Sequence, residues 1–141
     1  MKISSIFGGM AGFIAGAIAG IIPFLTYRVY WLTGILERPP YMQTIFDAIN
    51  QLITHVGNNA FWGALFGLTI SLVFDRIPGK GIKKGLFIGL IYCSLAIFYP
   101  VSTYLTLGDM ATTAEYLRNG PIDKFVYGIL FVLIYERLLR K

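Results

Sequence analysis

A group of polar side chains interrupts the apolar sequence near the middle of the chain. His55 is followed closely by Asn58 and Asn59. An imidazole changes its charge near neutral pH and could act as a gate or a ligand contact, and asparagine amides either bridge helices or line a polar path. We expect His55 to form hydrogen bonds at the membrane interface and the two asparagines to bridge helices, with a polar path as the alternative.

Hydroxyl side chains form a second polar group. Ser102, Thr103 and Tyr104 follow Pro100 in a later apolar run. A proline in a membrane helix frees a backbone carbonyl, which a nearby hydroxyl can satisfy. This favours a packing role, and the alternative is a hydroxyl-lined pathway that would join the polar path or gate formed by His55, Asn58 and Asn59.

The sequence lacks the residue patterns that are typical of metal sites, enzyme active sites and proton-driven transporters. The chain has one histidine and one cysteine, Cys93, and no acidic cluster at ligand spacing, so we expect no metal and no cofactor. It contains no phosphate-binding loop and no nucleophile motif, so we expect no enzyme. No carboxylate, lysine or arginine lies in the middle of a long apolar run, which argues against proton-driven transport.

Long apolar runs dominate the sequence. Hydrophobic residues make up 56% and charged residues 13% of the chain, against roughly 25% charged residues in an average soluble domain. A helix needs about 20 residues to cross the hydrocarbon core. We therefore predict an all-α integral membrane protein, a compact four-transmembrane-helix bundle in one domain, 1–141, with spans at about 3–27, 57–75, 84–106 and 121–139. The fourth span requires Lys124 and Arg137 to extend toward opposite interfaces, and a surface helix is the alternative.

The segment between the first two spans has its own periodicity. Apolar residues recur at helical spacing over about 41–56, and polar residues occupy much of the remaining circumference. This pattern is typical of a helix that lies in a membrane interface. We therefore predict an extra amphipathic helix in the first outer loop.

Glycine recurs in four-residue steps within the apolar runs. Such steps place the glycines on nearly one face of a helix, and each glycine costs about 1 kcal/mol relative to alanine in a water-exposed helix. In lipid, a face of small residues lets another helix approach closely. The predicted helix-packing residues are Gly8, Gly12, Gly16, Gly20, Gly63, Gly67, Gly85 and Gly89.

The charges predict an orientation. The formal net charge is +5, and the basic side chains gather near the N-terminus, in the linker after the second span and at the C-terminus. The positive-inside rule predicts that these three regions are cytoplasmic. We therefore expect a multi-pass protein of the plasma membrane with both termini on the cytoplasmic side. The expected contacts with lipid headgroups, which we favour over nucleic acid, are Arg76, Lys80, Lys83, Lys84, Arg137 and Arg140.

Function is the least determined property of this sequence. We expect a non-catalytic accessory or structural subunit, held by its glycine faces against other membrane subunits or a second copy of itself. The alternative is a homo-oligomeric channel or facilitator for a small ion or solute. The motifs identify no family.

Overall fold

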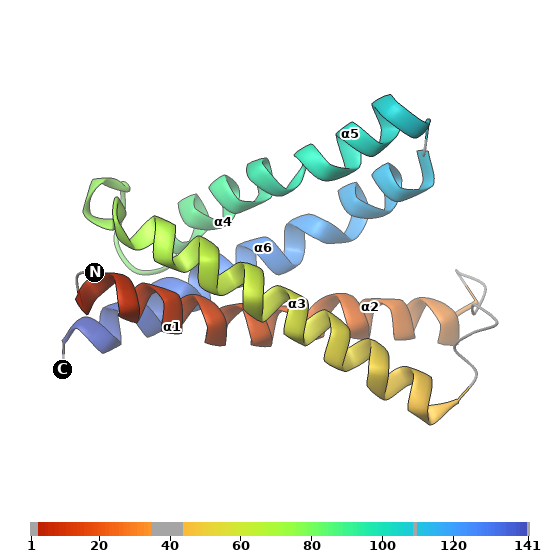
Figure 1. Cartoon of the computed structure of the whole chain (residues 1–141), viewed down its shortest axis with the longest axis horizontal. Helices are drawn as coiled ribbons and strands as arrows, with labels where there is room; N and C mark the ends of the chain where they lie inside the picture. The colour runs from red at the N-terminus through yellow and green to blue at the C-terminus, as the bar shows by residue number, and fades with distance from the viewer. Residues whose placement is uncertain (1–2, 35–43, 109, 141) are drawn as a thin grey trace.

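Helices make up nearly all of the part of the chain that the computed structural model describes, which is residues 3–34, 44–108 and 110–140, and these residues include no strand. The elements in chain order are α1 (Ile3–Ala19), α2 (Ile21–Leu32), α3 (Ile45–Ser71), a short 3-10 helix η1 (Phe74–Arg76), α4 (Ile82–Ala96), α5 (Phe98–Leu107) and α6 (Met110–Leu139). The prediction of an all-helical protein is confirmed. The two ends of the chain lie at the same end of the molecule (Figure 1), which we call the terminal end.

Two prolines divide helical rods in the same way. Pro23 is the third residue of α2 and Pro100 is the third residue of α5. A proline has no N–H to donate to the carbonyl four residues earlier, and its ring clashes with that carbonyl. These carbonyls belong to Ala19 and Ala96, the last residues of α1 and α4. The first rod is therefore α1 followed by α2, and the third rod is α4 followed by α5.

The helix α3 is continuous where the sequence predicted two separate elements. It begins after Thr44, whose hydroxyl accepts a hydrogen bond from Asp47 N at 3.1 Å while Thr44 N donates to Asp47 Oδ2 at 2.9 Å. This reciprocal capping box fixes the start of the helix. No proline interrupts the following residues, so the described part of the expected amphipathic helix at 41–56 and most of the expected span at 57–75 form one helix, which ends at Ser71. Residues 41–43 lie outside the described residues.

The helix α6 begins well before the predicted fourth span. The sequence predicted a fourth span at about 121–139, because Gly120 and Pro121 favour a helix start, but α6 runs from Met110 and contains Pro121 in its interior. Neighbouring helices can compensate the hydrogen bond that such a proline removes. Asp123 and Lys124 therefore lie in the middle of a helix and not at its start.

The first rod is in close backbone contact with α3, which is the second rod. A Cβ atom added at Gly12 would overlap the carbonyl of Gly63, and one added at Gly63 would lie 3.0 Å from Gly16 Cα. The α1–α3 pair accordingly has the most extensive contact between any two of the described helices. The predicted glycines that line this contact are Gly8, Gly12, Gly16, Gly20, Gly63 and Gly67.

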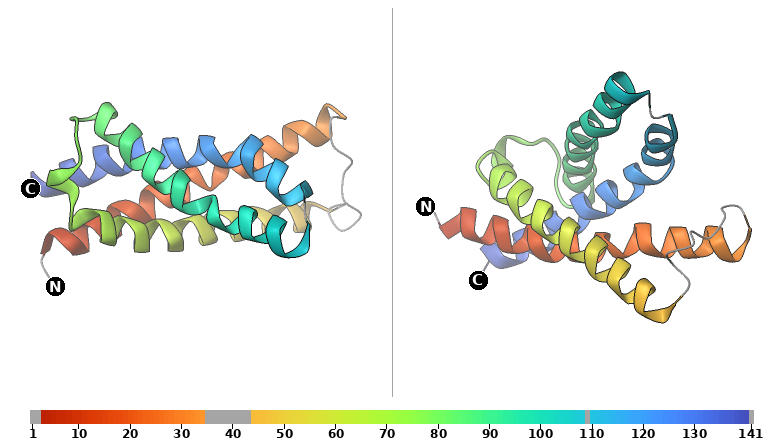
Figure 2. Two further views of the ribbon diagram at one scale, coloured as in Figure 1. Left: turned by 90° about the horizontal axis from the view of Figure 1, so that it is seen from above. Right: turned by 45° about the vertical axis from the view of Figure 1, so that its right-hand side comes forward.

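A second close pair joins α4 to α6. A Cβ atom at Gly85 would lie 2.6 Å from Ile129 Cα, and one at Gly89 would lie 2.8 Å from Phe125 Cα. Gly128 of α6 completes this contact, since its added Cβ would lie 2.8 Å from Gly89 Cα. Away from the terminal end, the hairpin of α5 and the start of α6 points away from α2 and the start of α3 (Figure 2).

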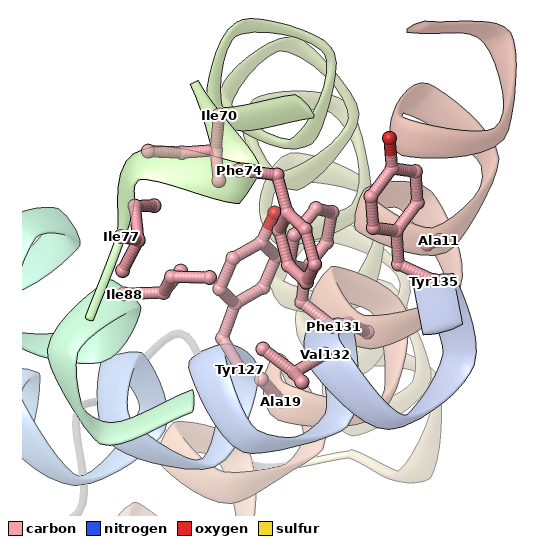
Figure 3. Close-up of a cluster of buried hydrophobic side chains, with 11 residues drawn as sticks. Ala11, Ala19, Ile70, Phe74, Ile77, Ile88, Tyr127, Phe131, Val132 and Tyr135 are labelled. Atoms are coloured by element: carbon pink, nitrogen blue, oxygen red, sulfur yellow. The ribbon is translucent and has the colours of Figure 1, made fainter. Parts of the chain in front are cut away.

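An aromatic column on α6 holds the two pairs together in the terminal half. Tyr127, Phe131 and Tyr135 are spaced four residues apart on one face of the helix and are 0 to 2% exposed. Their rings stack on one another with centroids 6.0 and 5.4 Å apart, and Phe74 packs edge-on against Tyr135 at 4.7 Å. Figure 3 shows this column between the turn after α3 and the alanine face of α1, which contributes Ala11 and Ala19.

The outward faces of the helices are apolar. Phe13 and Leu25 on the first rod and Leu90 and Leu95 on the third are about half exposed. Two segments among the described residues are long and apolar enough to cross a membrane, Ser4–Thr26 with a mean hydropathy of 1.9 and Ile82–Thr106 with 1.8. These properties suit a lipid-facing surface.

Lys84 is buried, in contrast to the prediction that it contacts lipid headgroups. It is 8% exposed, its Nζ donates to Phe74 O at 3.0 Å, and the same atom lies 4.0 Å from the centre of the Phe74 ring. It therefore ties the start of α4 to η1, since its long side chain reaches the Phe74 carbonyl, which also accepts a hydrogen bond from Ile77 N at 3.2 Å. The other five predicted contacts, Arg76, Lys80, Lys83, Arg137 and Arg140, lie on residues that are exposed or partly exposed.

Replacing Lys84 by methionine should lower the free energy of unfolding by about 1.5 kcal/mol, because the hydrogen bond from a charged donor is lost while most of the packing is kept. Thermal unfolding in detergent measures this change. Lys83→Met is the matched control, because Lys83 is exposed on the same turn of α4 and should change stability by less than about 0.5 kcal/mol. Equal effects of both substitutions would contradict the structural role of Lys84.

Candidate polar site at the centre of the helices

A buried ion pair lies in the middle of α6. Lys124 Nζ is 2.7 Å from Asp123 Oδ2, and the side chains are 13% and 7% exposed respectively. A distance this short is typical of a charge-assisted hydrogen bond. Removing two charges from water is expensive, so the position of this pair requires an explanation.

Residues from two other helices surround the pair. Lys124 Nζ also donates to Asn59 Oδ1 of α3 at 3.5 Å and lies 5.1 Å from the centre of the Tyr92 ring of α4. Asn59 Nδ2 in turn donates to the backbone carbonyl of His55 at 3.0 Å. We call these five residues, Asp123, Lys124, Asn59, Tyr92 and His55, the central polar site.

The glycine contacts bring this site together. A Cβ atom at Gly16 would overlap the Asn59 carbonyl, and one at Gly20 would lie 2.8 Å from the His55 carbonyl. On the other side, a Cβ at Gly89 would lie 2.9 Å from the Lys124 carbonyl. Larger residues at these positions would separate the helices that supply the polar side chains.

The central polar site lies near the middle of α3 and α6, and level with the middle of the two apolar segments. At about 1.5 Å per residue, Asp123 is about 20 Å or more from either end of α6 and Asn59 is about 20 Å from either end of α3. Ser4–Thr26 is centred next to Gly16, and Ile82–Thr106 is centred two residues from Tyr92. The hydrocarbon core extends only about 15 Å to either side of its midplane, so a bilayer centred on these segments would contain the site near its middle.

One oxygen of the pair is left without a partner. Asp123 Oδ1 is buried and accepts no hydrogen bond from any described residue. A buried polar atom without a partner costs about 1 to 3 kcal/mol, and more if it is charged. Such atoms are uncommon in folded proteins, and each requires an explanation, such as a catalytic role, a bound ion or a bound water molecule.

An aromatic layer closes the site toward the terminal end. The rings of Phe66 and Tyr92 stack at 4.4 Å, and Tyr127 packs edge-on against Tyr92 at 4.8 Å. The Tyr127 hydroxyl donates to Gly63 O at 2.7 Å and so ties α6 to α3. Beyond this layer the aromatic column described above fills the terminal half.

The structure separates the residues that the sequence grouped as a polar path or gate. His55 and Asn59 belong to the central polar site, whereas Asn58 is exposed on another face of α3. Ser102 and Tyr104 are exposed on α5, and the side chain of Thr103 lies outside the described residues. Asp123 and Lys124 were not predicted as site residues, because the predicted fourth span, at about 121–139, placed both charges at the start of a helix.

A shallow pocket of about 250 Å³ lies away from this site. It is formed between α2 and the first turns of α3 by a mainly apolar set of residues that includes Phe24, Arg28 and Thr44. The Arg28 guanidinium lies 5.5 Å from the centre of the Phe24 ring, a cation–π distance. The pocket is open and shares no residue with the central polar site, which is the stronger candidate.

The chain has a distant similarity to a known protein. No family model and no solved structure matches the chain. Over 102 residues the chain is 26% identical to a protein of Legionella pneumophila described as an uncharacterized transporter. The match covers 72% of this chain and 22% of that protein, so the chain spans about a fifth of its relative. The apolar helices and this similarity together indicate an all-helical membrane protein.

Proposed function

We propose that this chain is a non-catalytic, multi-pass membrane protein that takes part in moving a small ion or solute across the bilayer, and that the central polar site lies on the path. The observation that carries the proposal is the buried Asp123–Lys124 pair at the middle of the helices. Charged residues at this depth are costly, and they usually mark substrate or ion pathways. The transporter named in the comparison supports the same class of function.

The shape of the site gives the path a direction. The aromatic layer and column fill the terminal half, whereas the α5–α6 hairpin diverges from α2 and α3 in the opposite half (Figure 2). Under the positive-inside rule the terminal end is cytoplasmic. Because the aromatic side chains fill the terminal side of the site, we propose that the path leads from the site to the outer side.

The accessory-subunit role predicted from the sequence stays a prediction. It would require a partner chain, and the glycine faces that suggested one are used within this chain, where α1 packs on α3 and α4 packs on α6. These contacts account for the glycine pattern without a second polypeptide. Transport is therefore the function that we favour, in a homo-oligomer or in a larger assembly.

Cysteine accessibility tests whether the site lies on a water-filled path. In a Cys93→Ser background, Asn59→Cys should react with a charged, membrane-impermeant thiol reagent added to the side opposite the termini. Ile88→Cys is the matched control, because Ile88 is 0% exposed in the core and should stay unreactive. Lys80→Cys, in the exposed turn before α4, should react only from the terminal side. An unreactive Asn59→Cys beside a reactive Lys80→Cys would contradict the path.

Vesicle swelling tests transport itself. Vesicles that contain the protein should swell faster than empty vesicles with at least one member of a panel of small neutral, zwitterionic and ionic solutes. The double substitution Asp123→Asn/Lys124→Gln should return the rate to that of empty vesicles, because it removes the charges of the site while leaving no buried charge unpaired. Asp75→Asn, at an exposed carboxylate in η1, should keep the wild-type rate.

A further inference from the structure

We propose that Asp123 is a proton-binding site, and that proton uptake on its Oδ1 atom breaks the ion pair with Lys124. This inference rests on the proposed transport function, to which it adds proton coupling. It rests directly on Asp123 Oδ1, a carboxylate oxygen that is buried, at the middle of a long helix, and without a hydrogen-bond donor among the described residues.

A proton suits this oxygen better than the other ligands that a carboxylate can take. A metal ion or an amine would lie next to Lys124 Nζ, which is only 2.7 Å from the other carboxylate oxygen, and like charges this close repel strongly in a poorly polar environment. The described residues also include no group of three histidine, cysteine or acidic side chains that could complete a metal shell. A proton needs neither a cavity nor further ligands.

The site provides a second position for the lysine. When a proton from bulk water forms the O–H bond on Asp123, the carboxyl group becomes neutral and no longer balances the charge of Lys124. The ammonium group already lies 3.5 Å from Asn59 Oδ1 and 5.1 Å from the centre of the Tyr92 ring. Both are acceptors for a cation, so the lysine can move from a contact within α6 to contacts with α3 and α4. Proton uptake thereby changes the connection between helices.

The groups that face Asp123 come from several helices. Lys124 lies on α6 itself, Tyr92 lies on α4, and His55 lies on α3. The helix α1 carries no ionisable side chain, and α5 carries none with a charge at neutral pH. Arg28 of α2 lies over the Phe24 ring. Lys124 opposes protonation because it stabilises the carboxylate, so its removal should favour the protonated form.

Infrared spectroscopy of the full chain in lipid, titrated with acid and base, detects this proton directly. The wild-type protein should show the carbonyl stretch of a protonated carboxyl group in a poorly hydrated environment, with an intensity that falls as the pH rises. Aspartate labelled with ¹³C at the side-chain carboxyl should shift the band, which requires no substitution. Asp123→Asn/Lys124→Gln should remove the band and Asp75→Asn should keep it, and in Lys124→Gln the band should persist to higher pH. Lys83→Gln is the control for the loss of one lysine and should leave the titration unchanged.

The outcomes distinguish this inference from the proposed function. The absence of the band at every pH, or its survival in the double variant, overturns proton binding at Asp123 even if vesicle swelling shows transport. A band assigned to Asp123 in a protein that moves no solute and shows no cysteine accessibility keeps the proton site and overturns the transport function. A melting curve for each variant verifies that the spectra compare folded proteins.

Discussion

Replacing Gly12 by alanine should lower the free energy of unfolding by about 3 kcal/mol, at the upper end of the usual cost of overpacking. The added Cβ would overlap the Gly63 carbonyl and lie 3.0 Å from Gly67 Cα. Both neighbours are backbone atoms, so no side chain can rotate to make room, and α1 must move away from α3. The movement would also separate the helices around the central polar site. Thermal or denaturant unfolding in detergent measures the loss.

Gly9→Ala is the matched control in the same helix. A Cβ atom at Gly9 would lie 3.9 Å from Leu68 Cδ1, which is ordinary van der Waals contact. This substitution should change the free energy of unfolding by about 1 kcal/mol or less. If Gly12→Ala were as stable as Gly9→Ala, the close approach of α1 to α3 would be wrong.

Replacing Asp123 alone by asparagine should lower the free energy of unfolding by about 3 to 5 kcal/mol, because it leaves the Lys124 ammonium buried without its counter-charge. The double substitution Asp123→Asn/Lys124→Gln should cost less than half as much, since neither group then carries a charge. A double-mutant cycle on the melting of the purified protein separates the pair from the two single effects.

The matched control for this cycle uses exposed charges of the same kinds. Asp75→Asn and Lys83→Met change side chains on exposed residues, and each should alter stability by less than about 0.5 kcal/mol. Additive effects of Asp123→Asn and Lys124→Gln would mean that the two side chains do not interact in the folded protein, and the central polar site would then need a different explanation.

Periodicity and composition predicted the helical class but not where the helices begin. The glycine steps in α1, α3 and α4 could be read from the sequence, because a four-residue repeat of small residues has a fixed position on a helix. The packing role of Gly128 in α6 could not be predicted, since no glycine lies four residues before or after it. It became visible only when α4 was placed against α6.

The two charges of the central polar site were not predicted, because the residues just before them favour a helix start that does not occur in the folded protein. An asparagine, a glycine and a proline just before Asp123 favour a helix start, yet α6 continues through them from Met110. A charge at a helix end is ordinary, whereas the same charge in the middle of a long helix is costly. Both charges were visible in the sequence, but only the length of α6 shows that they lie in the middle of a helix. His55 and Asn59 were recognised because they stand beside an apolar run in the sequence itself.

The placement of both charges next to each other on α6 has a consequence for how the protein enters its membrane. A single aspartate or lysine at the centre of an inserting helix costs about 2.5 to 3.5 kcal/mol. Because the Lys124–Asp123 contact forms between adjacent residues, the two charges can neutralise each other before any other helix is present. The helix α6 can thus be delivered to the bilayer with no net charge at its centre, and the assembling chain does not need to supply a counter-ion from another helix.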